Sequence, residues 1–229
     1  MPDDRQLLAL HVAALFAIDD AGRLRHGNDI GSPQAPRFYL GRTRHEATCH
    51  VRADLPAGLA EQLLAHGHDE PPTPDLRTPP RHEQIYRELL MPRQQVWFGP
   101  AYWLETAAPQ NRKAVAITRA NAMLLAGTFD DWQGEVDDRQ PCYCVLERGR
   151  AVSLCASARI TAAACEAGVE TLPDHRGRGH AVSAVSAWAA AVAELGALPL
   201  YSTSWQNVAS QRVAAKCGFS AYASDYHIA

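Results

Sequence analysis

Residues 172–188 read LPDHRGRGHAVSAVSAW, and this stretch decides how the second half of the chain folds. Two arginines, two histidines and two glycines stand before a segment in which Val182, Val185 and Trp188 recur every three residues. That period predicts a helix with one apolar face, buried in a core. A helix that begins in a glycine-rich turn leaves unpaired backbone N–H groups at the positive end of its dipole, so we expect an anion site here.

The side chains of the turn fit a diphosphate. Gly177 and Gly179 let a phosphate approach the backbone closely, while Arg176 and Arg178 add positive charge. A Walker loop needs GxxxxGK followed by Ser or Thr, and a Rossmann loop needs a third glycine where this chain has Val182, so neither pattern applies. The alternative is a solvated basic turn.

The two histidines of the turn, His175 and His180, are weaker candidates. They contact phosphate if protonated, and otherwise they are surface residues.

The segments around this turn alternate in type. Runs at residues 142–147 and 151–159 are strand-like, and Gly149 between them predicts a hairpin. The other expected elements of this half are strands at 165–172, 198–204 and 219–228, and helices at 177–196 and 207–218. The order is ββ and then β-α-β-α-β, which predicts a mixed α/β fold.

The first half of the chain carries no chemical motif. We expect an apolar segment at 7–18, a strand at 38–40, helices at 59–65, 82–90 and 114–126, and an aromatic strand at 96–104 broken by Gly-Pro. The proline-rich residues 71–80 predict an extended connector.

Composition is that of an ordinary soluble protein of one large or two small domains. The 229 residues are 47% hydrophobic, and 22 Lys plus Arg against 25 Asp plus Glu give a net charge of −3. This balance argues against nucleic acid or an anionic membrane as partner. The apolar segment 7–18 is too short to span a bilayer and lacks a cleavage site, so we expect a cytoplasmic protein.

Metal and disulfide signals are weak. The six cysteines form no CxxC, and we expect free thiols. The triplets at 66–68 (HGH) and 142–144 (CYC) lack a partner pair at ligand spacing, so we expect no metal.

Two quoted stretches resemble the GCN5-related N-acetyltransferase (GNAT) family: VETLPDHRGRGHA at 169–181 and LYSTSWQNVASQRVAAKCGF at 200–219. The family's diphosphate loop has Arg or Gln, two residues, Gly, one residue, and Gly or Ala, which here are Arg176, Gly179 and Ala181. The likeness extends to Pro173, to an Asn opening the next helix and to the Gly-Phe that closes it. It is specific over about residues 151–228 and weaker over 112–150.

The resemblance implies a mostly antiparallel central sheet flanked by helices and splayed between two parallel strands. It implies an acetyltransferase domain at 111–229, preceded by an N-terminal accessory region at 1–110. Three roles stay open for that region: a cap on the cleft, a degenerate acyltransferase-like lobe, or a homodimer contact.

The resemblance also implies acetyl-CoA as cofactor, with its diphosphate on the amides of 176–181 and its pantetheine along 168–172. The residues expected to bind it are Val169, Glu170, Thr171, Arg176, Gly177, Arg178, Gly179, His180, Ala181, Asn207 and Ser210.

Direct attack by an amine needs a base, a polarised carbonyl and an acid. In this family a backbone N–H of the strand before the loop polarises the carbonyl, here at 169–171. Glu166 and Glu170 are the candidate bases, and their spacing of four puts both on one strand face unless a bulge intervenes. Each is alternatively a solvent-exposed strand carboxylate.

The usual acid of the family, a tyrosine, is replaced here by Ala214. The candidates to replace it are Ser210, Tyr201, Tyr222, Tyr226 or water. Arg159 and Trp205 bracket the presumed acceptor side, and residues 36–42 offer aromatic and basic groups, but packing and solubility are the favoured explanation for these residues.

These inferences predict an N-acetyltransferase that acts on a primary amine of a small molecule or peptide. The alternative is a non-catalytic acyl-CoA-binding or sensing module of the same fold.

Overall fold

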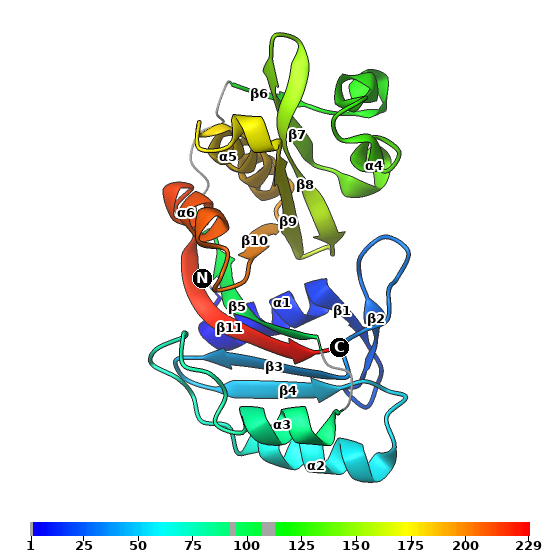
Figure 1. The fold of residues 1–229 in the computed structure, drawn as a ribbon, viewed down its shortest axis with the longest axis vertical. Coiled ribbons are helices and arrows are strands. Elements are labelled where there is room, and N and C mark those ends of the chain that lie inside the picture. The colour runs from blue at the N-terminus through cyan, green and yellow to red at the C-terminus, as the bar shows by residue number, and fades with distance from the viewer. Residues whose placement is uncertain (1, 92–94, 107–112) are drawn as a thin grey trace. The chain divides into compact units, whose positions relative to one another are not determined.

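The computed structural model describes residues 2–91, 95–106 and 113–229 (Figure 1). Its contacts divide the chain into two compact units. Unit 1 comprises Met1–Tyr102, Ser202–Val208 and Ala221–Ala229, and unit 2 comprises Trp103–Tyr201 and Ala209–Ser220. The expected boundary between residues 110 and 111 lies outside the described residues, so the division at that point stays a prediction.

Unit 1 contains four strands in the order β4-β3-β11-β5, a small β1–β2 ladder and three helices. The elements are α1 (Asp4–Leu15), β1 (Phe16–Ile18), β2 (Leu24–Gly27), β3 (Phe38–Thr43), β4 (Ala47–Val51), α2 (Ala57–His68), α3 (Glu83–Leu89), β5 (Val96–Trp103) and β11 (Ser220–Ile228). The apolar segment 7–18 therefore divides into a helix and a strand. β5 runs through the Gly-Pro step that we expected to break it.

β3 is buried along its whole length because helices cover both of its faces. Phe38 and Leu40 belong to a core with residues of α2 and α3. The intervening Gly41 faces α1, where an added Cβ would lie 2.7 Å from Leu8. The alternation of strand side chains thus places Phe38 and Leu40 on one face and Gly41 on the other.

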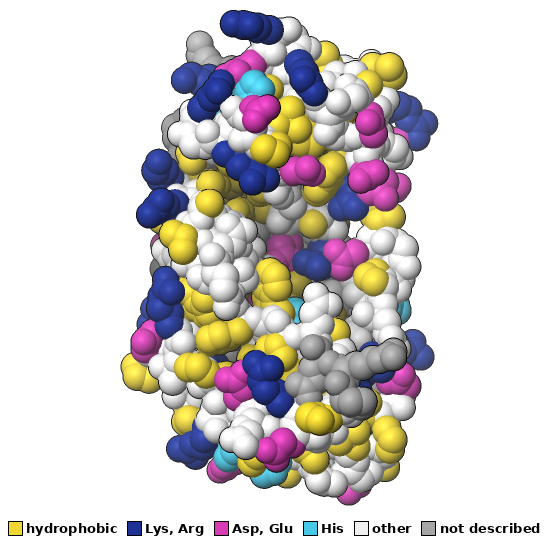
Figure 2. Space-filling view, in the orientation of Figure 1, with side chains coloured by type: hydrophobic (Ala, Val, Ile, Leu, Met, Phe, Trp, Pro, Cys, Tyr) yellow, Lys and Arg dark blue, Asp and Glu magenta, His cyan; other side chains and the backbone are white. Residues whose placement is uncertain are grey.

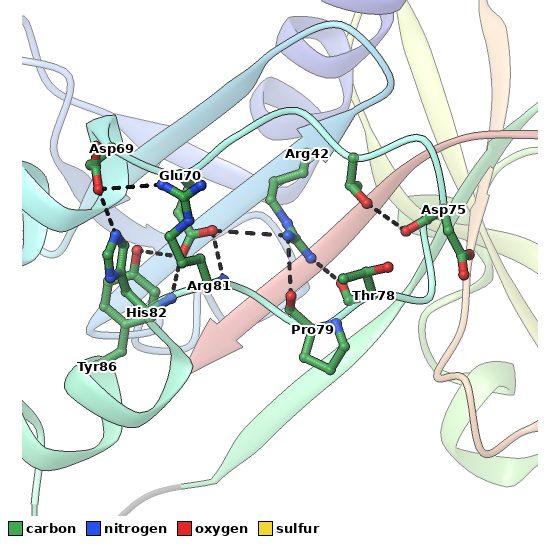
Figure 3. Close-up of polar contacts among 10 residues, drawn as sticks. Arg42, Asp69, Glu70, Asp75, Thr78, Pro79, Arg81, His82 and Tyr86 are labelled. Atoms are coloured by element: carbon green, nitrogen blue, oxygen red, sulfur yellow. Dashed lines mark hydrogen bonds and ion pairs between the residues drawn. The ribbon is translucent and has the colours of Figure 1, made fainter.

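A buried arginine holds the proline-rich connector against β3 (Figure 3). Arg42 is 2% exposed, and its guanidinium donates to the carbonyl oxygens of Thr78 and Pro79. Burial lowers the pKa of Arg42, and the nearby Glu70 carboxylate offsets part of that effect. Residues 36–42 are buried except for the half-buried Arg37, which agrees with the packing role favoured from the sequence.

Glu70 fixes the other end of the same connector (Figure 3). Its carboxylate accepts hydrogen bonds from the backbone N–H groups of Arg81 (2.9 Å) and His82 (2.8 Å) and from the hydroxyl of Tyr86 (2.9 Å). It also lies 3.9 Å from Nη1 of Arg42. Arg42 of β3 and Glu70, two residues after α2, thus hold residues 71–82 in place within unit 1. Residues 71–80 contain no helix or strand.

We predict that Glu70→Ala destabilises the protein by about 3–5 kcal/mol, because it leaves the buried Arg42 charge without its carboxylate partner. Urea denaturation followed by circular dichroism measures the free energy of unfolding. Glu61→Ala, on the exposed face of α2, is the control and should change that energy by less than about 0.5 kcal/mol. Equal midpoints for the two variants would contradict the structural role.

Unit 2 contains five strands in the order β10-β9-β8-β7-β6. Its elements are β6 (Ala114–Ala116), η1 (Arg119–Leu125), α4 (Asp130–Gln133), η2 (Val136–Arg139), β7 (Cys142–Glu147), β8 (Arg150–Ile160), β9 (Ala164–Thr171), η3 (Pro173–His175), α5 (His180–Glu194), β10 (Leu198–Ser202) and α6 (Val208–Lys216). β9 and β10 are parallel, and the other strand pairs are antiparallel. The mixed, mostly antiparallel fold flanked by helices is confirmed.

The two faces of the unit 2 sheet pack against different elements. Leu154 and Ala156 of β8 lie in a core with Leu125, Phe129 and other residues of the segment before β7. On the opposite face Trp188 of α5 is fully buried, and its Nε1 donates to Oγ of Ser157 at 3.0 Å. The core position expected for Trp188 is therefore confirmed.

One expected element of this half was wrong. Residues 114–126 form the short strand β6 and the 3-10 helix η1 instead of one α-helix. Ala114, Val115 and Ala116 pair with β7, so strand pairing replaces local helix preference in the first turn of the expected helix.

The cysteines are buried and free, and burial raises the pKa of Cys144 to about 11. Positive and negative side chains are interspersed on the face that Figure 2 shows. Among the described residues, no helix combines the length and apolarity needed to cross a bilayer.

Candidate active site

The anion site expected from the sequence is a turn between β9 and α5. The 3-10 helix η3 follows Leu172, and Gly179 is the N-cap of α5 with no side-chain cap. Gly177 and Gly179 have φ values of +76° and +85°, and a Cβ built on either would meet nothing within 4 Å. Glycine is favoured at these angles, and the space beside the turn is open.

The backbone N–H groups of residues 177–182 donate to no acceptor in the part of the chain that the structure describes. The N–H groups on either side are engaged, since Arg176 donates to the carbonyl of Pro173 and Ser183 to that of Gly179. Six donors are thus gathered at the N-terminus of a 15-residue helix. Such an arrangement binds anions through both hydrogen bonds and the helix dipole.

The two arginines of the turn are exposed and brace its backbone. Nε of Arg176 donates to the carbonyl of Thr171 at 3.2 Å, and Nη2 of Arg178 donates to the carbonyl of Asp174 at 2.9 Å. Both guanidinium groups therefore lie beside the donors of the turn.

Glu147, which the sequence did not single out, is the counter-charge of the turn. Its Oε2 lies 2.9 Å from Nδ1 of His175 and 3.6 Å from Nη1 of Arg178, and its Oε1 lies 2.9 Å from Nε2 of His180. Desolvation would raise the pKa of Glu147, but the hydrogen bond from His175 and the nearby charges bring it below its usual value. Glu147 ends β7, so the hairpin β7–β8 holds the turn.

The same three residues could hold a metal ion. One ligand atom each from Glu147, His175 and His180 lie within 4.8 Å of one another. Nε2 of His180 is buried and, despite its closeness to Glu147, lacks hydrogen-bond geometry to any described residue. The triplets at 66–68 and 142–144, considered above as metal signals, do not include these residues.

β9 and β10 pair over three residues and then separate. The pairs are Leu198 with Ala164, Pro199 with Cys165, and Leu200 with Glu166, whereas β9 continues to Thr171. The N–H of Leu172 bonds to β8, so by alternation the N–H groups of Val169 and Thr171 point away from β8, toward the side that β10 leaves. The splay between two parallel strands is confirmed.

Glu166 lies at the point where the two strands separate. It is 1% exposed, and its Oε2 accepts from Nη1 of Arg159 at 2.6 Å across the β8–β9 ladder. The ladder has a bulge between Ser157 and Arg159, which shifts the pairing of the two strands beside Glu166. The solvent-exposed alternative for Glu166 was therefore wrong.

Glu170, nearer the turn, is exposed and contacts α4. Its Oε2 accepts a hydrogen bond from Nε1 of Trp132 at 3.0 Å. A Cβ on Gly168 would lie 2.6 Å from the same indole, so Gly168 and Glu170 both face Trp132. The indole of Trp132 in turn stacks against Arg139, whose guanidinium carbon is 4.6 Å from the ring centroid.

Two hydroxyl groups meet close to the position of the missing tyrosine. The hydroxyl of Tyr201 in β10 lies 2.7 Å from Oγ of Ser210 in α6. Ala214, one helical turn after Ser210, is fully buried.

The other residues expected at the site belong to unit 1. They are Asn207, which directly precedes α6, the acid candidates Tyr222 and Tyr226, and Trp205. The guanidinium carbon of Arg77 lies 4.3 Å from the ring centroid of Trp205. Arg159 belongs to unit 2. The expected roles of these residues stay predictions.

Residues 121–228 match the family model described as GNAT acetyltransferase. The resemblance to the GNAT family is confirmed over these residues. No curated protein matches this chain.

Some solved structures resemble the chain beyond residues 121–228. A GCN5-related N-acetyltransferase-like protein from Streptococcus suis 89/1591 is 17% identical, with 93% of this chain and 87% of that chain covered and a TM-score of 0.51. A GCN5-related N-acetyltransferase from Sphaerobacter thermophilus is 14% identical, with 87% and 81% covered and a TM-score of 0.49.

A GNAT-family protein from Novosphingobium aromaticivorans DSM 12444 is 19% identical, with 58% of this chain covered and a TM-score of 0.46; this chain spans 64% of that protein's chain. At such identities the likeness to the Streptococcus suis protein supports the fold alone.

We predict that Gly179→Trp in the GNAT domain weakens CoA binding by at least about 100-fold, because the indole obstructs the donors of the turn and two lost hydrogen bonds to phosphate suffice for that factor. Isothermal titration calorimetry with CoA measures the affinity. Gly196→Trp, at the other end of α5, has a similar φ of +77° and open surroundings, so it controls for backbone strain. CoA affinity equal to that of the unmodified protein would contradict the site.

Proposed function

We propose that this protein is an acetyl-CoA-dependent N-acetyltransferase that acts on a primary amine of a small molecule or peptide. The observation that carries the proposal is the set of unengaged N–H groups of residues 177–182, directly after the strand that β10 leaves. These donors fit the diphosphate of CoA, and the β9 residues up to Thr171 fit its pantetheine arm. Acetyl-CoA supplies an activated thioester.

Glu166 is the better of the two candidate bases by position. Five residues of strand, or about 17 Å, separate Thr171 from Glu166. An arm that runs along β9 from the turn would bring its thiol end toward Glu166, whereas Glu170 lies beside the start of the arm. Arg159 fixes the orientation of the Glu166 carboxylate. Glu166 therefore accepts the amine proton in this proposal, and Glu170 lines the arm.

We predict that Glu166→Gln lowers kcat by about 100-fold to 10,000-fold, because the amide keeps the shape but cannot accept the proton. CoA affinity should change little. Steady-state kinetics and calorimetry measure the two quantities, and Glu170→Gln is the matched comparison, with a smaller loss of kcat. Equal losses of kcat and affinity in Glu166→Gln would reassign it to a structural role.

The hydroxyl pair of Tyr201 and Ser210 is the candidate acid. A phenol that donates toward a hydroxyl, which in turn donates toward the leaving thiolate, supplies the proton that the missing tyrosine would supply. The two residues belong to neighbouring elements of one unit, so the pair does not depend on the placement of the units.

We predict that Tyr201→Phe and Ser210→Ala each lower kcat by about 10-fold to 100-fold, the worth of one hydrogen bond to a charged group. Because the two hydroxyls act as one unit, the double variant should lose no more than the larger single loss. Tyr143→Phe, on β7, is the control. Losses that multiply in the double variant would show that the hydroxyls act separately.

One observation favours the second candidate, a non-catalytic acyl-CoA-binding module. Ala214 stands at the position of the usual acid, so binding could persist where the chemistry has been lost.

Thiol release from acetyl-CoA with a broad panel of amines separates the two candidates. Release that depends on an amine supports the transferase. Tight CoA binding with no release across the panel favours the module, and no CoA binding excludes both.

A further inference from the structure

A basic cavity lies beside the turn, between it and the hairpin β7–β8. Its volume is about 420 Å³, and it is lined by Glu147, Arg148, Arg150, Val152, His175 and Arg178. All of these residues belong to unit 2. His175 and Arg178 come from the turn itself, so the cavity and the expected diphosphate site share side chains.

The charges of the cavity do not cancel. Glu147, the one acidic residue of the lining, is already approached by His175, by His180 and by Arg178. The side chains of Arg148 and Arg150 make no hydrogen bond or ion pair with any residue in the described part of the chain. Two arginines without a counter-charge at one cavity favour an anion, and they disfavour a metal ion on Glu147, His175 and His180.

The turn of the hairpin has an unusual backbone conformation for an arginine. Arg148 and Gly149 form a two-residue turn in which both φ values are positive, +51° and +80°. Asn or Gly is the usual residue at the first of these positions, and another side chain there is strained. Residues with such backbone strain are often found at functional sites.

The chemistry of the neighbouring turn identifies the anion. In CoA one ribose carries the diphosphate on its 5′ carbon and a phosphomonoester on its 3′ carbon. An arginine guanidinium binds phosphate through paired hydrogen bonds, and a phosphomonoester carries about two negative charges at neutral pH. We propose that Arg148 and Arg150 bind the 3′-phosphate of CoA, an inference that rests on the proposed function. The protein therefore discriminates CoA from 3′-dephospho-CoA.

Calorimetry of the full chain with CoA and with 3′-dephospho-CoA tests this proposal. The unmodified protein should bind CoA at least about tenfold more tightly, since a hydrogen bond to a charged group is worth that factor. The double variant Arg148→Ala/Arg150→Ala should bind both nucleotides with the affinity that the unmodified protein has for 3′-dephospho-CoA. The control Arg5→Ala/Arg25→Ala removes two exposed arginines of unit 1 and should keep the preference.

The outcomes separate this inference from the proposed function. Equal affinity of the unmodified protein for both nucleotides overturns the inference and leaves the proposed function intact. A preference that survives in Arg148→Ala/Arg150→Ala also overturns it, because the 3′-phosphate then binds elsewhere. Failure of both nucleotides to bind overturns the proposed function together with the inference. If the double variant unfolds at the same temperature as the unmodified protein, its fold is retained.

Discussion

The site depends on the separation of two parallel strands. Parallel strands need a crossover connection, and α5 provides it between β9 and β10. Because the strands pair only as far as Glu166, the second half of β9 keeps its outward N–H groups, and the crossover helix begins at the same end with six more. Binding at the carboxyl ends of strands, where neighbours diverge, is the general rule for open α/β sheets. The interrupted pairing and the turn that follows it together supply the backbone donors that the proposed function uses.

One carboxylate, Glu147, offsets part of the positive charge at this end of the sheet. Two arginines in three residues, Arg176 and Arg178, repel each other if nothing opposes them. Glu147 approaches both histidines and Arg178, so these contacts join the turn to the hairpin β7–β8. Preorganisation of this kind lowers the cost of binding because few side chains lose freedom in the complex. Both histidines contact Glu147 in this structure, and the phosphate contact expected for them stays a prediction.

The sequence predicted those turns and helices whose conformation depends on a few neighbouring residues. Gly149 marked the β7–β8 turn, and the apolar period at Val182, Val185 and Trp188 marked α5, because backbone conformation and helix faces are read over a few residues. The helix predicted for residues 114–116 was wrong because pairing with β7 decides their conformation. Glu147 was missed because it meets His175 across 28 positions of sequence. The burial of Glu166 was equally out of reach, since it depends on how Arg159 and a bulge in β8 are aligned with β9.

A phenol can lie near position 214 even though residue 214 is not a tyrosine. Ala214 is fully buried, and the carbonyl of Ala214 accepts from the N–H of Phe219 at the end of α6. Ser210 lies one turn earlier on the same helix face, and the neighbouring strand brings the phenol of Tyr201 within 2.7 Å of it. A phenol therefore reaches this face of α6 from β10. The tyrosine is lost at one position of α6, but two hydroxyl groups lie close to it, and this weakens the argument from Ala214 for lost catalysis.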